Sequence, residues 1–201
     1  FVHSDAQGKL WIGAGQTLYY LSGMQSNVAK WKKFDCDFLQ SLVDDGQGHL
    51  YLGTFGRGVT CVDTRTGAMR LFSMFDKDRG RGKLCNNWML AMLYDSHHLL
   101  WIATSAGVSC YDPAKDSFKP YGWHNLLDGY ACLSLAEDRH GNLLIGTDRG
   151  LFRFDRRRNK VSAFPGRGEL GDKSIGAIVA QGNGDVWCST SMGIWHYRAG
   201  G

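Results

Sequence analysis

Residues 138–155 read DRHGNLLIGTDRGLFRFD. The polar segment Asp138-x-x-Gly141 precedes a short apolar run that ends at Thr147, and a glycine then opens a second apolar run. Asp and Gly favour tight turns, because Asp hydrogen-bonds to nearby backbone groups and Gly adopts positive φ without steric cost. Each apolar run has the length of one β-strand. The segment therefore predicts a hairpin turn followed by two antiparallel strands.

This pattern occurs five times along the chain of 201 residues. The copies start at Asp5, Asp45, Asp95, Asp138 and Gln181. Six residues after each start lies an apolar anchor, which is Trp11, Tyr51, Trp101, Leu144 or Trp187. Successive anchors are 40, 50, 43 and 43 residues apart. A repeat of about 40–50 residues that contains several short strands is typical of a β-propeller, in which each repeat forms one blade.

Each repeat is predicted to form a four-stranded antiparallel sheet, with strands A to D running from the centre outward. The Asp-x-x-Gly turn joins A to B, the anchor lies in strand B, and a glycine opens strand C. We expect one all-β domain over residues 1–201. Its repeats are expected at about 1–34, 35–72, 84–121, 128–164 and 172–201. His98 replaces the turn glycine of the third copy, and Gln181 replaces the turn Asp of the fifth.

The two ends of the chain indicate an incomplete ring. The sequence begins within strand A of the first repeat and ends just after strand C of the fifth, so the last repeat lacks its outer strand. A closed five-bladed ring would leave strand C of that repeat with unpaired backbone groups. We therefore expect an open arc of five blades that is part of a seven-bladed propeller, with the remaining blades in the parent chain.

Charge and composition restrict the function classes. The net charge of +4 permits an acidic ligand. It is lower than the charge typical of nucleic-acid-binding domains, so no nucleic-acid partner is predicted. No apolar run approaches the roughly 18 residues of a membrane span, so this segment is not expected to insert into a membrane. The basic run at 156–160 is interpreted as a solvated hairpin tip. The insertion at 73–83 is either a mobile basic loop for an acidic ligand or a plain surface excursion.

No catalytic, metal or cofactor site is predicted. The repeated Asp residues occupy one turn position in successive repeats, so we interpret them as structural. Four histidines lie in the A–B turns of three different repeats, too far apart for one metal with bonds of about 2 Å. They are His49, His97, His98 and His140.

The six cysteines are expected to be buried thiols that pack as small apolar side chains. Cys61 and Cys110 occupy the same position of neighbouring repeats, where their Cα atoms would be farther apart than the about 6 Å of a disulfide. A disulfide among Cys36, Cys85 and Cys132 is the alternative.

The repeat resembles the two-component regulator propeller repeat, whose pattern is Asp-x-x-Gly-x-Leu-Trp-Ile-Gly-Thr followed by Gly-Leu-x-Arg-Tyr-Asp. Residues 95–112 and 138–155 match it best, and the five copies cover essentially the whole chain. The resemblance implies the periplasmic sensor domain of a Bacteroides-type hybrid two-component system. It also implies an oligosaccharide from polysaccharide breakdown as the ligand and further domains of the parent chain with a histidine kinase. A second copy of the chain, in a homodimer, is a further candidate partner.

Propeller geometry places the candidate ligand contacts on one face, where the B–C loops and the D–A connections surround the axis. Aromatic rings there could stack on sugar rings, while Arg and Asn could bind hydroxyls, carboxylates or sulfates. The candidates are Phe55, Arg57, Asn87, Trp88, Trp123, His124, Tyr130 and Arg149. For Trp88 and Tyr130 the alternative is packing between blades. For the whole domain the alternatives are a protein-interaction scaffold and a propeller lyase or hydrolase.

Overall fold

The strands of the chain form five antiparallel sheets in chain order, which we call blades 1 to 5. The structure is a computed structural model that describes residues 2–5, 8–25, 28–35, 38–75, 83–119, 127, 129–165, 170 and 172–199. Between residues 22 and 35 it describes the backbone only. Blades 1 to 4 have four strands each and blade 5 has three.

The strands are numbered along the chain. Blade 1 consists of β1 (Val2–Ser4), β2 (Leu10–Ala14), β3 (Thr17–Gln25) and β4 (Val28–Asp35). Blade 2 consists of β5 (Leu39–Asp44), β6 (His49–Thr54), β7 (Gly58–Asp63) and β8 (Met69–Phe72). Blade 3 consists of β9 (Met89–Tyr94), β10 (Leu100–Thr104), β11 (Gly107–Asp112) and β12 (Ser117–Phe118). Blade 4 consists of β13 (Cys132–Glu137), β14 (Leu143–Thr147), β15 (Gly150–Asp155) and β16 (Lys160–Ala163). Blade 5 consists of β17 (Ile175–Ala180), β18 (Val186–Thr190) and β19 (Gly193–Tyr197).

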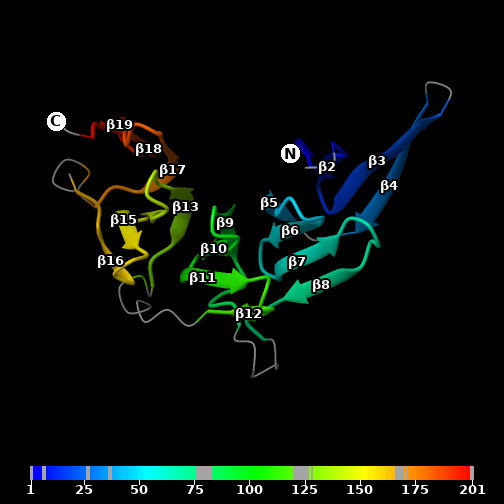
Figure 1. The fold of residues 1–201 in the computed structure, drawn as a ribbon, viewed down its shortest axis with the longest axis horizontal. Coiled ribbons are helices and arrows are strands. Elements are labelled where there is room, and N and C mark those ends of the chain that lie inside the picture. Colours follow the sequence, from blue (N-terminus) through cyan, green and yellow to red (C-terminus); the bar gives the residue numbers. More distant parts are fainter. Residues whose placement is uncertain are drawn as a thin grey trace.

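The blades follow one another around an open arc (Figure 1). The inner strands β5, β9, β13 and β17 lie side by side in that order. Blade 1 and blade 5 form the two ends of the arc and do not meet (Figure 1). The predicted all-β blades, the open arc and the three-stranded last blade are therefore confirmed.

The repeated Asp holds the A–B turn together. In blade 3, Asp95 Oδ1 accepts hydrogen bonds from the backbone N–H groups of His97 and Leu99, each at 2.9 Å. Its second oxygen, Oδ2, accepts a hydrogen bond from the indole N–H of Trp101. The corresponding residues of blade 1 make the same backbone and indole bonds at 2.7 and 2.8 Å. The carboxylate thus joins the turn to the anchor, which confirms its structural role in these blades.

Blades 2 and 4 have no Trp anchor, and another donor takes its place. His49 Nδ1 lies 2.8 Å from Asp45 Oδ2, and Asn142 Nδ2 donates to Asp138 Oδ2 at 3.0 Å. Both donors lie four residues after the Asp, two residues before the anchor. In these blades, too, the second carboxylate oxygen of the turn Asp therefore pairs with a side-chain donor, although the anchor cannot supply one.

The fourth residue of every A–B turn has left-handed backbone geometry, as predicted for the turns that carry glycine there. The φ angles at these positions lie between 59° and 101°, at Gly8, Gly48, His98, Gly141 and Gly184. His98 shows that the third copy keeps the turn although its residue carries a side chain. Strand B ends with a Thr in blades 2 to 5. The Thr hydroxyl donates a hydrogen bond at 2.9–3.0 Å to the carbonyl of the glycine that opens strand C, and this bond closes the B–C turn.

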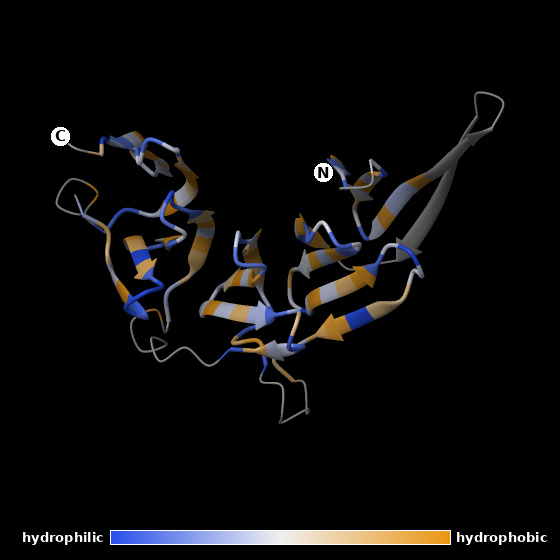
Figure 2. Cartoon of the chain, in the orientation of Figure 1, coloured by the Kyte–Doolittle hydropathy of each residue, from blue (hydrophilic) through white to orange (hydrophobic). Residues whose placement is uncertain are grey.

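Four of the five anchors are buried in the core between blades, namely Trp11, Tyr51, Trp101 and Leu144, whereas Trp187 is 38% exposed. Trp101 is fully buried in one cluster with Leu143 and Ile145 of β14, so it packs against strand B of the next blade. Leu144 lies likewise in one cluster with Val186 and Cys188 of β18. Figure 2 shows orange, hydrophobic bands along the strands and hydrophilic colours at many of the turns. Each blade is therefore stabilised mainly by its neighbours.

Arg156 was predicted to lie in a solvated hairpin tip, and this is wrong for that residue. Its side chain is only 15% exposed, and its guanidinium donates to Asp95 Oδ2 in the neighbouring blade. The same group lies 5.3 Å from the centre of the Trp101 ring. Arg157 and Arg158 are exposed, as expected for a tip. Arg156 differs because it reaches across the rim and ties blade 4 to blade 3.

The described cysteines form no disulfide. They are Cys61, Cys85, Cys110, Cys132 and Cys188, while Cys36 lies outside the described residues. Most of the predicted insertion, residues 76–82, also lies outside them. Across the described ranges, no helix is long and apolar enough to cross a membrane, and no group of His, Cys, Asp or Glu side chains is arranged to hold a metal.

Candidate ligand-binding face

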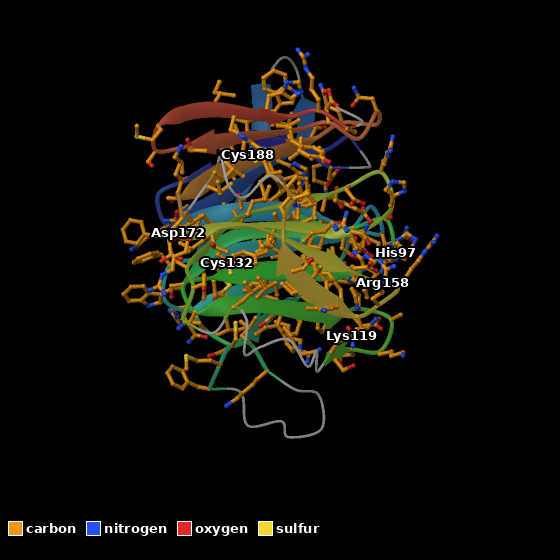
Figure 3. The ribbon with its side chains drawn as sticks, turned by 90° about the vertical axis from the view of Figure 1, so that its left-hand side faces the viewer. His97, Lys119, Cys132, Arg158, Asp172 and Cys188 are labelled. Carbon is orange, nitrogen blue, oxygen red and sulfur yellow. The ribbon has the colours of Figure 1, made fainter. Side chains whose placement is uncertain are left out.

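The two rims of the arc carry different turns, because the strands of each blade alternate in direction. B–C turns and D–A connections lie on one rim, which we call the B–C rim. A–B and C–D turns lie on the other, the A–B rim. Figure 3 shows this separation: Asp172, in a D–A connection, lies on the opposite side from His97 of an A–B turn and Arg158 of a C–D turn. The sequence places every candidate residue on the B–C rim.

Among the candidates that the structure describes, the most exposed aromatic feature is the pair Phe55 and Trp88. Phe55 lies in the B–C turn of blade 2, and Trp88 lies in the connection that leads into blade 3. Their ring centres are 4.8 Å apart with an angle of 32° between the planes. The two residues are 49% and 50% exposed. The two rings therefore form a small exposed apolar patch on the B–C rim.

Backbone hydrogen bonds fix this aromatic pair in place. Phe55 and Trp88 form an isolated antiparallel bridge between the two blades. The N–H groups of Gly56 and Gly58 both donate to the carbonyl of Asn87 at 3.1 Å. These hydrogen bonds join the B–C turn of blade 2 to the connection that leads into blade 3.

Asn87 has a supporting role in this arrangement. The residue is buried, its Oδ1 accepts from the Met74 N–H at 2.7 Å, and its Nδ2 donates to Ser73 Oγ at 3.1 Å. The side-chain amide is thus used within the chain, whereas Arg57, beside Phe55, is exposed. Of the four candidates in blades 2 and 3, three therefore present surface to a ligand.

Tyr130 and Arg149 form a second group on the same rim, in blade 4. The Arg149 guanidinium lies 5.1 Å from the centre of the Tyr130 ring, and its Nε lies 3.7 Å from Asp148 Oδ2. Tyr130 also packs edge-on against Phe152 at 5.6 Å. Tyr130 is half-buried and packs against the core between blades 3 and 4, whereas Trp88 is half-exposed and its ring contacts Phe55 of blade 2. Trp123 and His124 lie outside the described residues, so the structure does not place them.

The sequence patterns missed Phe38, which is also exposed on the B–C rim. Its carbonyl accepts a hydrogen bond from the Phe55 N–H at 3.1 Å. Phe38 directly precedes β5 as Trp88 directly precedes β9. Alignment of the connections between repeats, in addition to the turns and strands, would have indicated an exposed aromatic residue at both positions.

No family model and no curated protein matches this sequence. Solved structures do match. An extracellular domain assigned to a hybrid two-component system of Bacteroides thetaiotaomicron has a TM-score of 0.77 and 20% identity, over 99% of this chain and 28% of that chain. A second extracellular domain from this organism, assigned to a one-component system, has a TM-score of 0.72 and 22% identity, over 96% and 26%. Virginiamycin B lyase from Staphylococcus aureus has a TM-score of 0.66 and 11% identity, over 99% and 69%.

The chain has the propeller fold of these bacterial sensor domains. The chain spans only about a quarter of their length, 28% and 26% of the two matched chains. The lyase shows that the same propeller fold also supports enzymes. With identities of 11–22%, the comparisons establish the fold, and function has to be argued from the residues of this chain.

Proposed function

We propose that this chain is the ligand-sensing propeller of a periplasmic two-component sensor and that it binds an oligosaccharide on the B–C rim. The observation that carries the proposal is the half-exposed Phe55–Trp88 pair, held rigidly between two blades. Aromatic faces offer a flat apolar surface that suits the C–H faces of sugar rings. The extracellular location of the structurally similar sensor domains supports a periplasmic role.

An acidic oligosaccharide suits the charges on this rim. Arg57 and Arg149 are both exposed there, and the chain carries a net charge of +4. Guanidinium groups bind carboxylates and sulfates through charge-assisted hydrogen bonds. Trp123 and His124 belong to the proposed site by their place in the sequence. In the parent protein, which we propose is a sensor histidine kinase that forms a homodimer, binding here would signal through the remaining blades to the downstream kinase.

The test is calorimetric titration of the purified chain with neutral and acidic oligosaccharides. We expect at least one to bind, and we expect Phe55→Ala and Trp88→Ala each to weaken it about 5- to 10-fold, or about 1–1.4 kcal/mol per ring. Met192→Ala is the control, because Met192 is 79% exposed in the B–C turn of blade 5 and contributes no ring. Binding that is unchanged in both aromatic variants would contradict the proposal.

The same purified proteins also test the two alternative functions, an enzyme and a protein-interaction scaffold. Product analysis after incubation with each oligosaccharide should show no cleavage, and turnover that is lost in Phe55→Ala or Trp88→Ala would instead establish a propeller lyase or hydrolase. A chain that ignores all sugars but captures a defined peptide through the aromatic pair would establish a scaffold.

A further inference from the structure

One strand-C residue lies directly opposite the anchor of each blade. These residues are Tyr20, Cys61, Cys110, Arg153 and His196. In blade 4 the anchor is Leu144, the smallest of the five anchors. The residue opposite it is Arg153, which has the longest side chain of the five opposite residues. Where other blades place a Trp or Tyr ring, blade 4 therefore places a guanidinium beside the space between blades 4 and 5.

The Arg153 guanidinium has a hydrogen-bonding requirement that the described residues do not meet. Its Nε is buried, and no described residue accepts a hydrogen bond from it. Arginine stays protonated at any pH at which the protein is folded. A buried N–H donor without an acceptor is costly, so an anion or a water molecule that accepted from Arg153 Nε would stabilise this position.

A cavity of about 320 Å³ lies between blades 2 and 3, and a smaller one of about 130 Å³ lies between blades 4 and 5. The smaller one, which we call the blade 4/5 cavity, is lined by Asp138, Arg139, His140, Arg153, Phe164 and Tyr197, among others. Phe164 and Tyr197 meet edge to face at 5.0 Å and form an apolar wall. One water molecule takes up about 30 Å³ in the liquid, so this cavity can hold a carboxylate or a sulfate group.

Arg139 supplies a second fixed cation. Its Nη1 donates to the Asn183 carbonyl of blade 5 at 2.7 Å, and its Nε donates to His140 Nε2 at 3.1 Å. Its guanidinium carbon would lie only 2.9 Å from a Cβ at position 184, so Gly184 leaves the space in which this group rests. Residues of both blades therefore position the cation at the cavity.

Asp138, the acidic residue that lines this cavity, already accepts hydrogen bonds within its own turn. Asp138 Oδ1 accepts from the backbone N–H groups of His140 and Asn142 at 2.8 and 2.9 Å, and Oδ2 accepts from Asn142 Nδ2 at 3.0 Å. The cavity between blades 2 and 3 differs, because there Arg70 forms an ion pair with Asp116. The cavity between blades 2 and 3 therefore contains a carboxylate that pairs with its arginine. The blade 4/5 cavity contains two arginines, and its one carboxylate, Asp138, already accepts hydrogen bonds from its own turn.

We propose that the blade 4/5 cavity is a binding site for a small oxyanion, a carboxylate or sulfate group, held between Arg153 and Arg139. The planar guanidinium matches the two oxygens of such a group, and charge-assisted hydrogen bonds of this kind are stronger than neutral ones. The site lies by the A–B turns, on the opposite rim from the Phe55–Trp88 pair, and does not rest on the proposed oligosaccharide function. The oxyanion is either free in solution or carried by a larger molecule.

The experiment measures thermal unfolding at constant ionic strength while sodium chloride is replaced by sodium sulfate or sodium acetate. We expect the wild-type midpoint to rise and to saturate with at least one of these anions. Arg153→Leu and Arg139→Gln should lose the saturable part of this rise. Arg158→Gln is the matched control, because it removes an exposed arginine of the same blade, paired with Asp155, and should keep the full response.

Calorimetry with sodium sulfate provides a second readout, in which Arg153→Leu should weaken binding at least tenfold. Sulfate also stabilises proteins non-specifically, so an equal rise in wild type and Arg153→Leu would overturn the proposal, as would the lack of any saturable rise. If Arg153→Leu fails to fold, Arg153→Lys and Arg139→Gln provide the same comparison.

Two further measurements identify the source of the oxyanion and distinguish this proposal from the proposed oligosaccharide site. Sodium glucuronate that binds more tightly than sodium acetate would indicate an acidic sugar, and equal affinity would indicate a free anion. Phe55→Ala should keep the anion response in full, so loss of sugar binding and loss of anion binding are distinguishable.

Discussion

Blades 3 and 5 carry the same anchor in very different surroundings. Trp101 of blade 3 is fully buried and its indole donates to the buried carboxylate of Asp95. Trp187 of blade 5 is 38% exposed, and its indole is 3.4 Å from Gln181 Oε1. It stacks on His196 of its own blade at 3.8 Å. The motif thus sets the backbone of each blade, whereas the next blade determines how much the anchor contributes to stability.

The strands that carry these anchors show the same difference. All five residues of β10 are buried, because blades cover both of its faces. In β18, Val186 and Cys188 are buried against blade 4, while Trp187 and Ser189 are exposed on the other face. A strand that is apolar on both faces needs a packed layer against each face. In this chain, blade 5 has a neighbouring blade on one face only.

Truncation of the two anchors gives the largest expected contrast. Trp101→Ala should lower the free energy of unfolding by about 3–5 kcal/mol, because it opens a cavity between blades 3 and 4. Trp187→Ala should cost about 1 kcal/mol or less, because its ring lies at an open face. Urea unfolding of the two variants beside wild type measures both values. Equal losses would show that the end blade is as tightly packed as the interior ones.

The turn carboxylate provides the next contrast. Asp95→Asn should cost about 2–4 kcal/mol, because an amide N–H₂ would face the donors of Trp101 and Arg156, and a buried charge partner is lost. Gln181→Ala should cost no more than about 0.5 kcal/mol, because Gln181 is exposed. The same urea experiment reports both. Similar effects at the two positions would mean that the inter-blade tie through Arg156 contributes little.

Backbone geometry in the turns gives a smaller effect. Gly141→Val should cost about 1–3 kcal/mol, because φ is +76° and an added Cβ would lie 2.8 Å from His97 Cε1. His98→Gly should stabilise the turn of blade 3 by up to about 1 kcal/mol, since His98 adopts φ of 59° with a side chain. Thermal midpoints of both variants check the signs. An unchanged midpoint for Gly141→Val would show that the turn tolerates a β-branched residue.

Thiol reactivity tests whether the end of the arc opens more easily. Burial raises the pKa of Cys132 to about 12 and that of Cys188 to about 11, from the ordinary 9.0. Both thiols thus stay protonated in the folded chain at pH 8, and their contribution to stability is complete below about pH 9 and lost as pH rises toward 11–12.

Reaction with iodoacetamide at pH 8 should therefore need local opening, and Cys188 of blade 5 should react before Cys132. Mass spectrometry of the modified peptides measures the order. Reaction of both thiols at the unfolded-state rate would contradict the protection, and equal slow rates would show that blade 5 opens no more easily than blade 4.

The sequence was sufficient for the fold because the features that define a blade are local. Asp, Gly and Thr act within one turn, so the hydrogen bonds of Asp95 and the closing bond of Thr104 could be expected from spacing alone. The period of the anchors then gave the blades and their order. His98 kept its turn against its residue type, because the bonds from Asp95 hold the backbone in place.

The candidate site was less predictable because it depends on contacts between blades. The sequence placed Phe55 and Trp88 on one rim but could not show that the backbone joins them. It could not separate Asn87, which is buried, from its exposed neighbour Trp88. Arg156 and Arg153 likewise gain their roles from a neighbouring blade, and no pattern within a single repeat reports on that contact.

The second oxygen of the turn Asp has a consequence for how this repeat tolerates substitution. In two blades that oxygen accepts a hydrogen bond from the indole of the residue six positions after the Asp, which we call the sixth position. In two others it pairs with a His or Asn side chain four positions after the Asp, which we call the fourth position. The fourth and sixth positions therefore act as one compensating unit. In a combinatorial library, a Leu at the sixth position should survive selection only together with a donor at the fourth. Scoring each position alone would treat both as freely variable and would miss the dependence between them.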